Sequence, residues 1–127
     1  MHVVKIQDWQ EKEHQLYNHD LIMELLEGMD TIAAEDLIYD TVEDIAVAIG
    51  QMNALFAYRN YARLRALAHS VGGNANMLGL IKLDRLTADL IGCLERCDHN
   101  AIGALVARIQ RVGEASLVAI WEMQDAL

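Results

Sequence analysis

The chain has 127 residues, 54% of them hydrophobic, which suits one folded domain with a single core and argues against wholesale disorder. It contains no proline and only 8 glycines, a composition that helical proteins tolerate and turn-rich β folds rarely show. The formal net charge of −9 leaves no basic footprint for nucleic acid or anionic lipid, and no run of about 18 apolar residues predicts a membrane span. We therefore expect a cytoplasmic protein with neither nucleic acid nor membrane as a partner.

Apolar side chains recur every three or four residues along most of the chain, a spacing that predicts amphipathic helices. A first helix is expected over 8–27, and Gly28 can end it. A second is expected over 33–56, with Asp30 or Thr31 as its cap. The apolar positions that define these helices are Trp9, Leu16, Met23 and Leu26, and then Ile38, Val42, Ile45, Ile49, Met52 and Phe56.

Three further helices are expected over 61–77, 80–97 and 100–125. Their candidate caps are Asn60 before the first and Asp98 or Asn100 before the last. Their apolar stripes comprise Leu64, Leu67, Ala68, Val71, Ala75 and Leu78; Leu83, Leu86, Leu90, Leu94 and Cys97; and Ile102, Leu105, Ile109, Val112, Ala119 and Met123.

No segment shows the alternation of a β-strand, so we expect an all-α fold. Long helices joined by short loops predict an up-down-up-down four-helix bundle, with the additional N-terminal helix packed across one end or side. The expected division is an N-terminal helical segment over 1–35, packing on the bundle, and the bundle itself over 36–127.

His69 is the first candidate for a functional side chain. It lies about 140° around its predicted helix from the apolar stripe, so we expect an exposed imidazole. Four of the six positions that surround it on the helix are alanine or glycine, including the adjacent pair Gly72 and Gly73. Each glycine inside a helix costs about 1 kcal/mol relative to alanine, so the pair suggests a surface that another macromolecule approaches closely. The alternative is a helix that ends at Val71 and a turn formed by "GGNAN".

The stretch "AHSVGGNANMLGL" resembles the signature of the histidine-containing phosphotransfer (HPt) family, in which an apolar residue, a glycine and an apolar-glycine pair follow the phosphoaccepting histidine. His69, Val71, Gly73, Leu78 and Gly79 fall on the matching positions. The preceding "RNYARLRALAH" is similar to the family's approach to its histidine. The resemblance covers about 36–125 and implies an HPt-like four-helix bundle whose third helix continues through both glycines.

The resemblance implies a role in two-component signal transduction. His69 would accept a phosphoryl group from a receiver-domain aspartate, or from a sensor kinase, and pass it to another response-regulator receiver. The expected partners are receiver domains and a hybrid histidine kinase, and the receiver would bring the Mg²⁺, so no cofactor of this chain is expected. Autophosphorylation is not expected, because the sequence has no Gly-rich phosphate loop.

The chain departs from the family at Gly72, where a lysine usually lies beside the phosphoryl group. Arg65, one turn before His69, could supply a cation there, as could Lys82 or Arg85 if the next helix turns them inward. Gly73 and Asn76 are expected on the partner-binding surface, together with an adjoining face of the second helix.

Two other functions stay open. The missing lysine fits a non-catalytic HPt-like bundle that binds receiver or kinase domains as an adaptor. A di-metal carboxylate bundle would need inward-facing Glu-x-x-His pairs, and the nearest match is a single "EKEH" at 11–14. Cys93 and Cys97 are interpreted as small core hydrophobes, because no second pair completes a zinc site.

Overall fold

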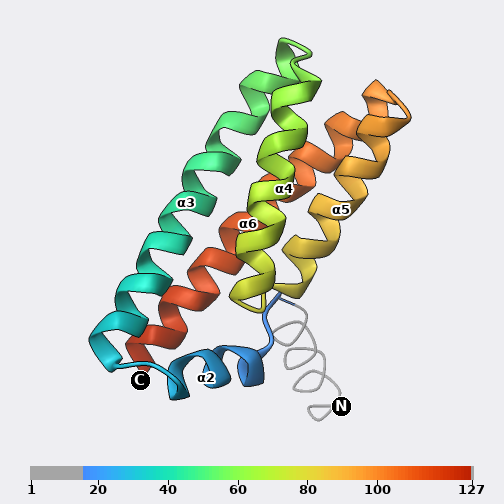
Figure 1. Cartoon of the computed structure of the whole chain (residues 1–127). Coiled ribbons are helices and arrows are strands. Elements are labelled where there is room, and N and C mark those ends of the chain that lie inside the picture. The colour runs from blue at the N-terminus through green and yellow to red at the C-terminus, as the bar shows by residue number, and fades with distance from the viewer. Residues whose placement is uncertain (1–15, 127) are drawn as a thin grey trace, which may run out of the picture.

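The computed structural model describes residues 16–126, and within that range the chain forms five helices and no strand. In Figure 1 the four longer helices lie side by side while α2 crosses one end. Helix α4 packs against α3 and α5, and α6 packs against the same two helices from the other side. The helices are α2 (His19–Glu27), α3 (Thr31–Ala57), α4 (Tyr61–Met77), α5 (Ile81–Glu95) and α6 (His99–Ala126).

Most of the predicted apolar positions meet in one core, although on α6 Ile120 is buried in place of the predicted Ala119. Spacings of four and three residues place Leu64, Ala68, Val71 and Ala75 on one side of α4, and all four are fully buried. The four leucines predicted for α5 are buried as well. Cys97 is an error of the prediction, because α5 ends at Glu95 and the Cys97 side chain is exposed. A division after residue 35 would fall within α3, and it stays a prediction.

The N-terminal helix differs from the single segment predicted over 8–27. The chain is not helical at Tyr17 and Asn18, and α2 begins only at His19. Asn18 caps α2, since its side-chain oxygen accepts hydrogen bonds from the backbone N–H groups of Asp20 and Leu21 at 3.0 and 3.3 Å. Asparagine favours this position over a helix interior because its side chain competes for backbone donors. Trp9, an apolar position of the predicted first helix, lies outside the described residues.

The three turns between the longer helices share one backbone conformation. Arg59, Gly79 and Cys97 adopt positive φ angles of 55°, 70° and 54°. In each turn the next N–H bonds to a carbonyl five residues back, as when Leu80 N donates to Ala75 O at 2.8 Å. This pattern is the Schellman motif, in which the left-handed residue favours glycine. Of these three turns, only the one between α4 and α5 has glycine at that position, Gly79.

Gly79 therefore has a structural role, although it also matches the last glycine of the HPt signature. Its carbonyl accepts a hydrogen bond from Asn18 N at 2.6 Å, and a Cβ at this position would lie 3.0 Å from Asn18 O. A side chain would strain the left-handed backbone and displace the segment that leads into α2.

We expect glycine at either of the other two turns to stabilise the fold. Arg59→Gly and Cys97→Gly should each raise the free energy of unfolding by about 0.5–1 kcal/mol, because the left-handed conformation penalises a Cβ and both side chains are exposed. Gly79→Ala is the inverse control and should lower it by about 1 kcal/mol. Urea denaturation measures all three, and an unchanged midpoint for both glycine variants would contradict the explanation.

No helix among residues 16–126 combines the length and the apolar character that crossing a membrane requires.

Candidate functional site

His69 lies near the middle of α4 with its side chain exposed. The helix continues through Gly72 and Gly73 to Met77, as predicted, so the alternative turn at "GGNAN" is wrong. Within the described part of the chain the imidazole makes no hydrogen bond or ion pair. The side chain is therefore accessible and not held by a structural partner there.

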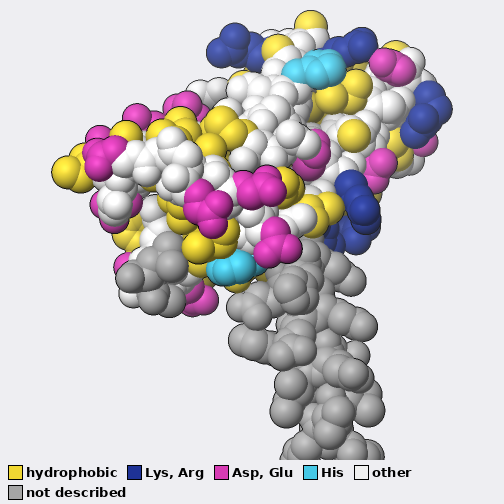
Figure 2. All heavy atoms as spheres, turned by 60° about the horizontal axis from the view of Figure 1, so that its bottom comes forward, with side chains coloured by type: hydrophobic (Ala, Val, Ile, Leu, Met, Phe, Trp, Pro, Cys, Tyr) yellow, Lys and Arg dark blue, Asp and Glu magenta, His cyan; other side chains and the backbone are white. Residues whose placement is uncertain are grey.

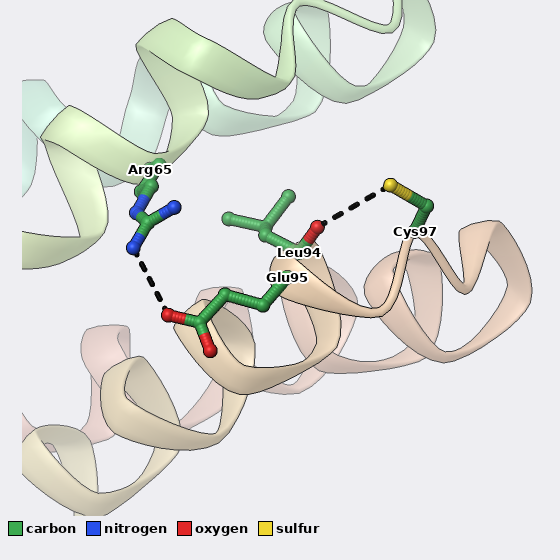
Figure 3. Close-up of polar contacts among 4 residues, drawn as sticks. All are labelled: Arg65, Leu94, Glu95 and Cys97. Atoms are coloured by element: carbon green, nitrogen blue, oxygen red, sulfur yellow. Dashed lines mark hydrogen bonds and ion pairs between the residues drawn. The ribbon is translucent and has the colours of Figure 1, made fainter.

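The neighbours of His69 on one side face α5 and fix the register of the two helices. Arg65 Nη2 lies 3.0 Å from Glu95 Oε1, and Figure 3 shows the guanidinium pointing across to that carboxylate. Asn76 Nδ2 donates a hydrogen bond to Asp84 Oδ2 at 3.2 Å. Residues later in α4 thus pair with residues earlier in α5. Arg65 and Asn76, two of the predicted site residues, already have partners on that helix.

This register does not bring Lys82 to His69. Lys82 precedes Asp84, which pairs with Asn76, so it lies level with the end of α4. At a rise of about 1.5 Å per residue, that level is about 13 Å along the helix from His69, farther than a lysine side chain spans. Arg85 is offset from His69 in the same direction. Among the cations considered from the sequence, only Arg65 lies within one turn of the histidine.

Gly72 and Gly73 have different surroundings. A Cβ at Gly72 would lie 2.8 Å from Thr87 Oγ1, whereas a Cβ at Gly73 would meet nothing within 4 Å among the described residues. Thr87 is buried, and its hydroxyl donates a hydrogen bond to Asp84 O at 2.7 Å. Gly72 therefore allows close packing of α4 on α5, while packing gives no reason for Gly73. The lysine of the HPt signature is missing at a position where a side chain would clash with Thr87 of α5.

A shallow groove of about 360 Å³ runs between α3 and α4 next to the histidine. Ser70, which follows His69, lines it together with Leu67 of the same helix. Val47 of α3 is 56% exposed there, beside the carboxylates of Glu43 and Asp44. One wall of this groove is formed by α3, the helix predicted to contribute a face to the partner-binding surface.

The Arg65–Glu95 pair is weakly held. The two side chains are 48% and 57% exposed, and ion pairs in such positions contribute about 0–1 kcal/mol to stability. A strong anion beside His69 could therefore draw the guanidinium away from Glu95.

Sequence reasoning missed the role of His99. Its ring stacks on Phe56 with centroids 4.6 Å apart, and its Nδ1 shares a hydrogen bond with the Tyr61 hydroxyl. The histidine thus ties the start of α6 to the turn between α3 and α4. The contacts of the His99 ring join residues that are far apart in the chain, so no local sequence pattern predicts them.

Cys93 is buried, as interpreted from the sequence.

No protein-family model, no curated protein and no solved structure matches this chain. Residues 16–126 contain no group of three or more His, Cys, Asp or Glu side chains placed to hold a metal ion. The "EKEH" pattern at 11–14 lies outside that range.

Proposed function

We propose that the chain is a phosphorelay intermediate of the HPt type, with α3–α6 as an up-down-up-down four-helix bundle. His69 accepts a phosphoryl group from a receiver-domain aspartate, or from a sensor kinase, and passes it to another response-regulator receiver. The observation that carries the proposal is an exposed mid-helix imidazole without a polar partner among the described residues, next to open space at Gly73. The groove at Ser70 gives a receiver a surface to dock on.

The transfer requires little from this chain beyond a nucleophile and a surface. A nitrogen lone pair of neutral His69 attacks the phosphorus of the aspartyl phosphate, the N–P bond forms, and the bond to the aspartate oxygen breaks to release the carboxylate. Positioning and charge stabilisation provide most of the catalysis in phosphoryl transfer. In this proposal the receiver brings the Mg²⁺, and the HPt chain brings the imidazole.

Arg65 is the residue of this chain that we assign to the phosphoryl group. It lies one helical turn before His69, and within residues 16–126 its guanidinium is bound only by a half-exposed carboxylate. A phosphoryl group carries more charge than Glu95 and can take two parallel hydrogen bonds from a guanidinium. Arg65 would exchange Glu95 for the phosphoryl group and occupy part of the space that the family's lysine fills.

Variants on either side of this ion pair should change transfer in opposite directions. Arg65→Gln is expected to lower the yield of phosphorylated chain by about threefold to tenfold, and Glu95→Gln is expected to raise it, because the guanidinium is then free. Arg111→Gln, at an exposed position on α6, is the matched control and should have no effect. The yield is measured with a phosphorylated receiver in excess. Equal losses in the Arg65 and Glu95 variants would indicate a structural role for the pair.

The experiment that tests the function is incubation of the chain with phosphorylated receiver domains from its source organism. Label should move to the chain and be lost in acid but retained in alkali, as expected of an N–P bond. If no receiver transfers label to the native chain, phosphotransfer is wrong.

The same surface supports a second function, a non-catalytic adaptor that binds receiver or kinase domains. The packing of Thr87 against Gly72 favours it, because a lysine at that position would clash with the Thr87 hydroxyl of α5 unless one of them moves. Receiver binding that is unaffected by His69→Ala, without label transfer, would establish the adaptor.

A further inference from the structure

A second hollow is lined by residues from the start of α3 and the end of α6. Figure 1 shows these two helix ends at the same end of the molecule, with α2 crossing there. The cavity measures about 560 Å³, a size typical of binding pockets. Tyr39 and Trp121 line it and are 53% and 51% exposed, while Ala34 and Ile38, also in its lining, are buried. No residue of α4 or α5 is among those that line the cavity, so it is separate from the surface around His69.

Apolar surface continues beyond the cavity on the same two helices. Ile32, seven residues before Tyr39 on α3, is 69% exposed, and Val118, three residues before Trp121 on α6, is 51% exposed. Spacings of three and seven place each pair on one helix face. Large apolar side chains gathered at an exposed position are typical of sites where another protein binds.

The charge around this surface is strongly negative. Residues 16–58 contain nine Asp and Glu residues and no Lys or Arg. Figure 2 shows acidic side chains gathered among hydrophobic ones toward the near end of the molecule, with Lys and Arg mostly toward its other parts. Glu35, Asp36 and Asp125 lie in the lining of the cavity itself. A partner would therefore be recognised by positive charge that surrounds an apolar anchor.

We propose that this surface, which we call the acidic end, binds a basic amphipathic segment of a partner protein. An apolar side chain of the segment fills the cavity between Tyr39 and Trp121, and its Lys or Arg residues pair with Glu35, Asp36 and Asp125. A second copy of the chain fits the acidic end poorly, because both surfaces would carry negative charge. A small organic cation would leave Ile32 and Val118 uncovered.

The test uses three short synthetic peptides as probes: an amphipathic helix of leucine and lysine, its counterpart with glutamate in place of lysine, and a lysine-serine peptide without apolar residues. Binding is followed by the indole N–H signals of the ¹⁵N-labelled chain, with Trp121→Phe identifying the signal of Trp121. We expect the leucine-lysine peptide to shift that signal and to bind more tightly than the other two, by at least about tenfold.

Variants separate the acidic end from net charge. Glu35→Gln with Asp36→Asn should weaken binding by about tenfold, whereas the matched pair Asp89→Asn with Glu114→Gln, elsewhere on the surface, should not. Tyr39→Ser should weaken it without changing the charge, and thermal melting confirms that each variant is folded. Equal loss in both charge pairs, equal binding of the lysine-serine peptide, or self-association of the native chain that Trp121→Ala abolishes would each overturn the proposal.

Discussion

His69→Gln is expected to abolish phosphoryl transfer from a receiver to the chain, lowering the labelled fraction by at least about a hundredfold, because glutamine offers no nucleophilic nitrogen. The free energy of unfolding should change by less than about 0.5 kcal/mol, since surface side chains without structural partners contribute little. His69 is exposed and makes no polar contact within the described part of the chain. Loss of transfer with unchanged stability would identify the imidazole as the acceptor.

The matched control is His19→Gln, which removes an imidazole from an exposed position on α2. It should transfer as the native chain does. His99 is unsuitable as a control, because its contacts with Phe56 and Tyr61 are structural. Label that persists in the His69 variant would place the acceptor elsewhere and contradict the assignment.

The helical framework could be predicted from the sequence because its causes are local. Helix periodicity is visible in the spacing of Leu64, Ala68, Val71 and Ala75. The start of a helix is visible in an N-cap such as Asn60, whose side-chain oxygen accepts a hydrogen bond from Arg63 N at 3.3 Å. The break at Asn18 was missed although its cause is also local. Apolar residues keep their helical spacing on both sides of Asn18, so the periodicity predicts one continuous helix although asparagine favours a capping position.

The candidate site could be predicted only in part, because its polar contacts cross between helices. The exposure of His69 follows from its angle to the stripe on its own helix. The partners of Arg65 and Asn76 depend on the register of α5, which the spacing within α4 does not determine. For the same reason the sequence left Lys82 as a candidate phosphoryl partner, although it lies level with the C-terminal end of α4, far from His69. The sequence already distinguishes Gly73, which matches the HPt signature, from Gly72, which departs from it. The packing of Thr87 against Gly72 crosses between helices and is visible only in the structure.

Gly72→Lys is expected to destabilise the fold, although it restores the residue that the HPt signature carries there. A Cβ would approach Thr87 Oγ1 to 2.8 Å, so either the buried Thr87 hydroxyl must give up its hydrogen bond to Asp84 O or α4 and α5 must move apart. We expect the free energy of unfolding to fall by about 2 kcal/mol, the cost of overpacking exceeding the gain in helix propensity. Chemical denaturation of both proteins measures the difference.

Gly73→Lys is the matched control, because it makes the same chemical change one residue away in open space. It should raise the free energy of unfolding by about 0.5 kcal/mol, since lysine is the better helix former. Thr87→Ala removes the offending hydroxyl and leaves a Cβ that is 3.7 Å from the added one. The cost of Gly72→Lys should therefore shrink in the Thr87→Ala background, and the coupling between the two positions isolates their contact. If Gly72→Lys and Gly73→Lys are equally stable, the helices are not closely packed at Gly72, and its departure from the signature needs another explanation.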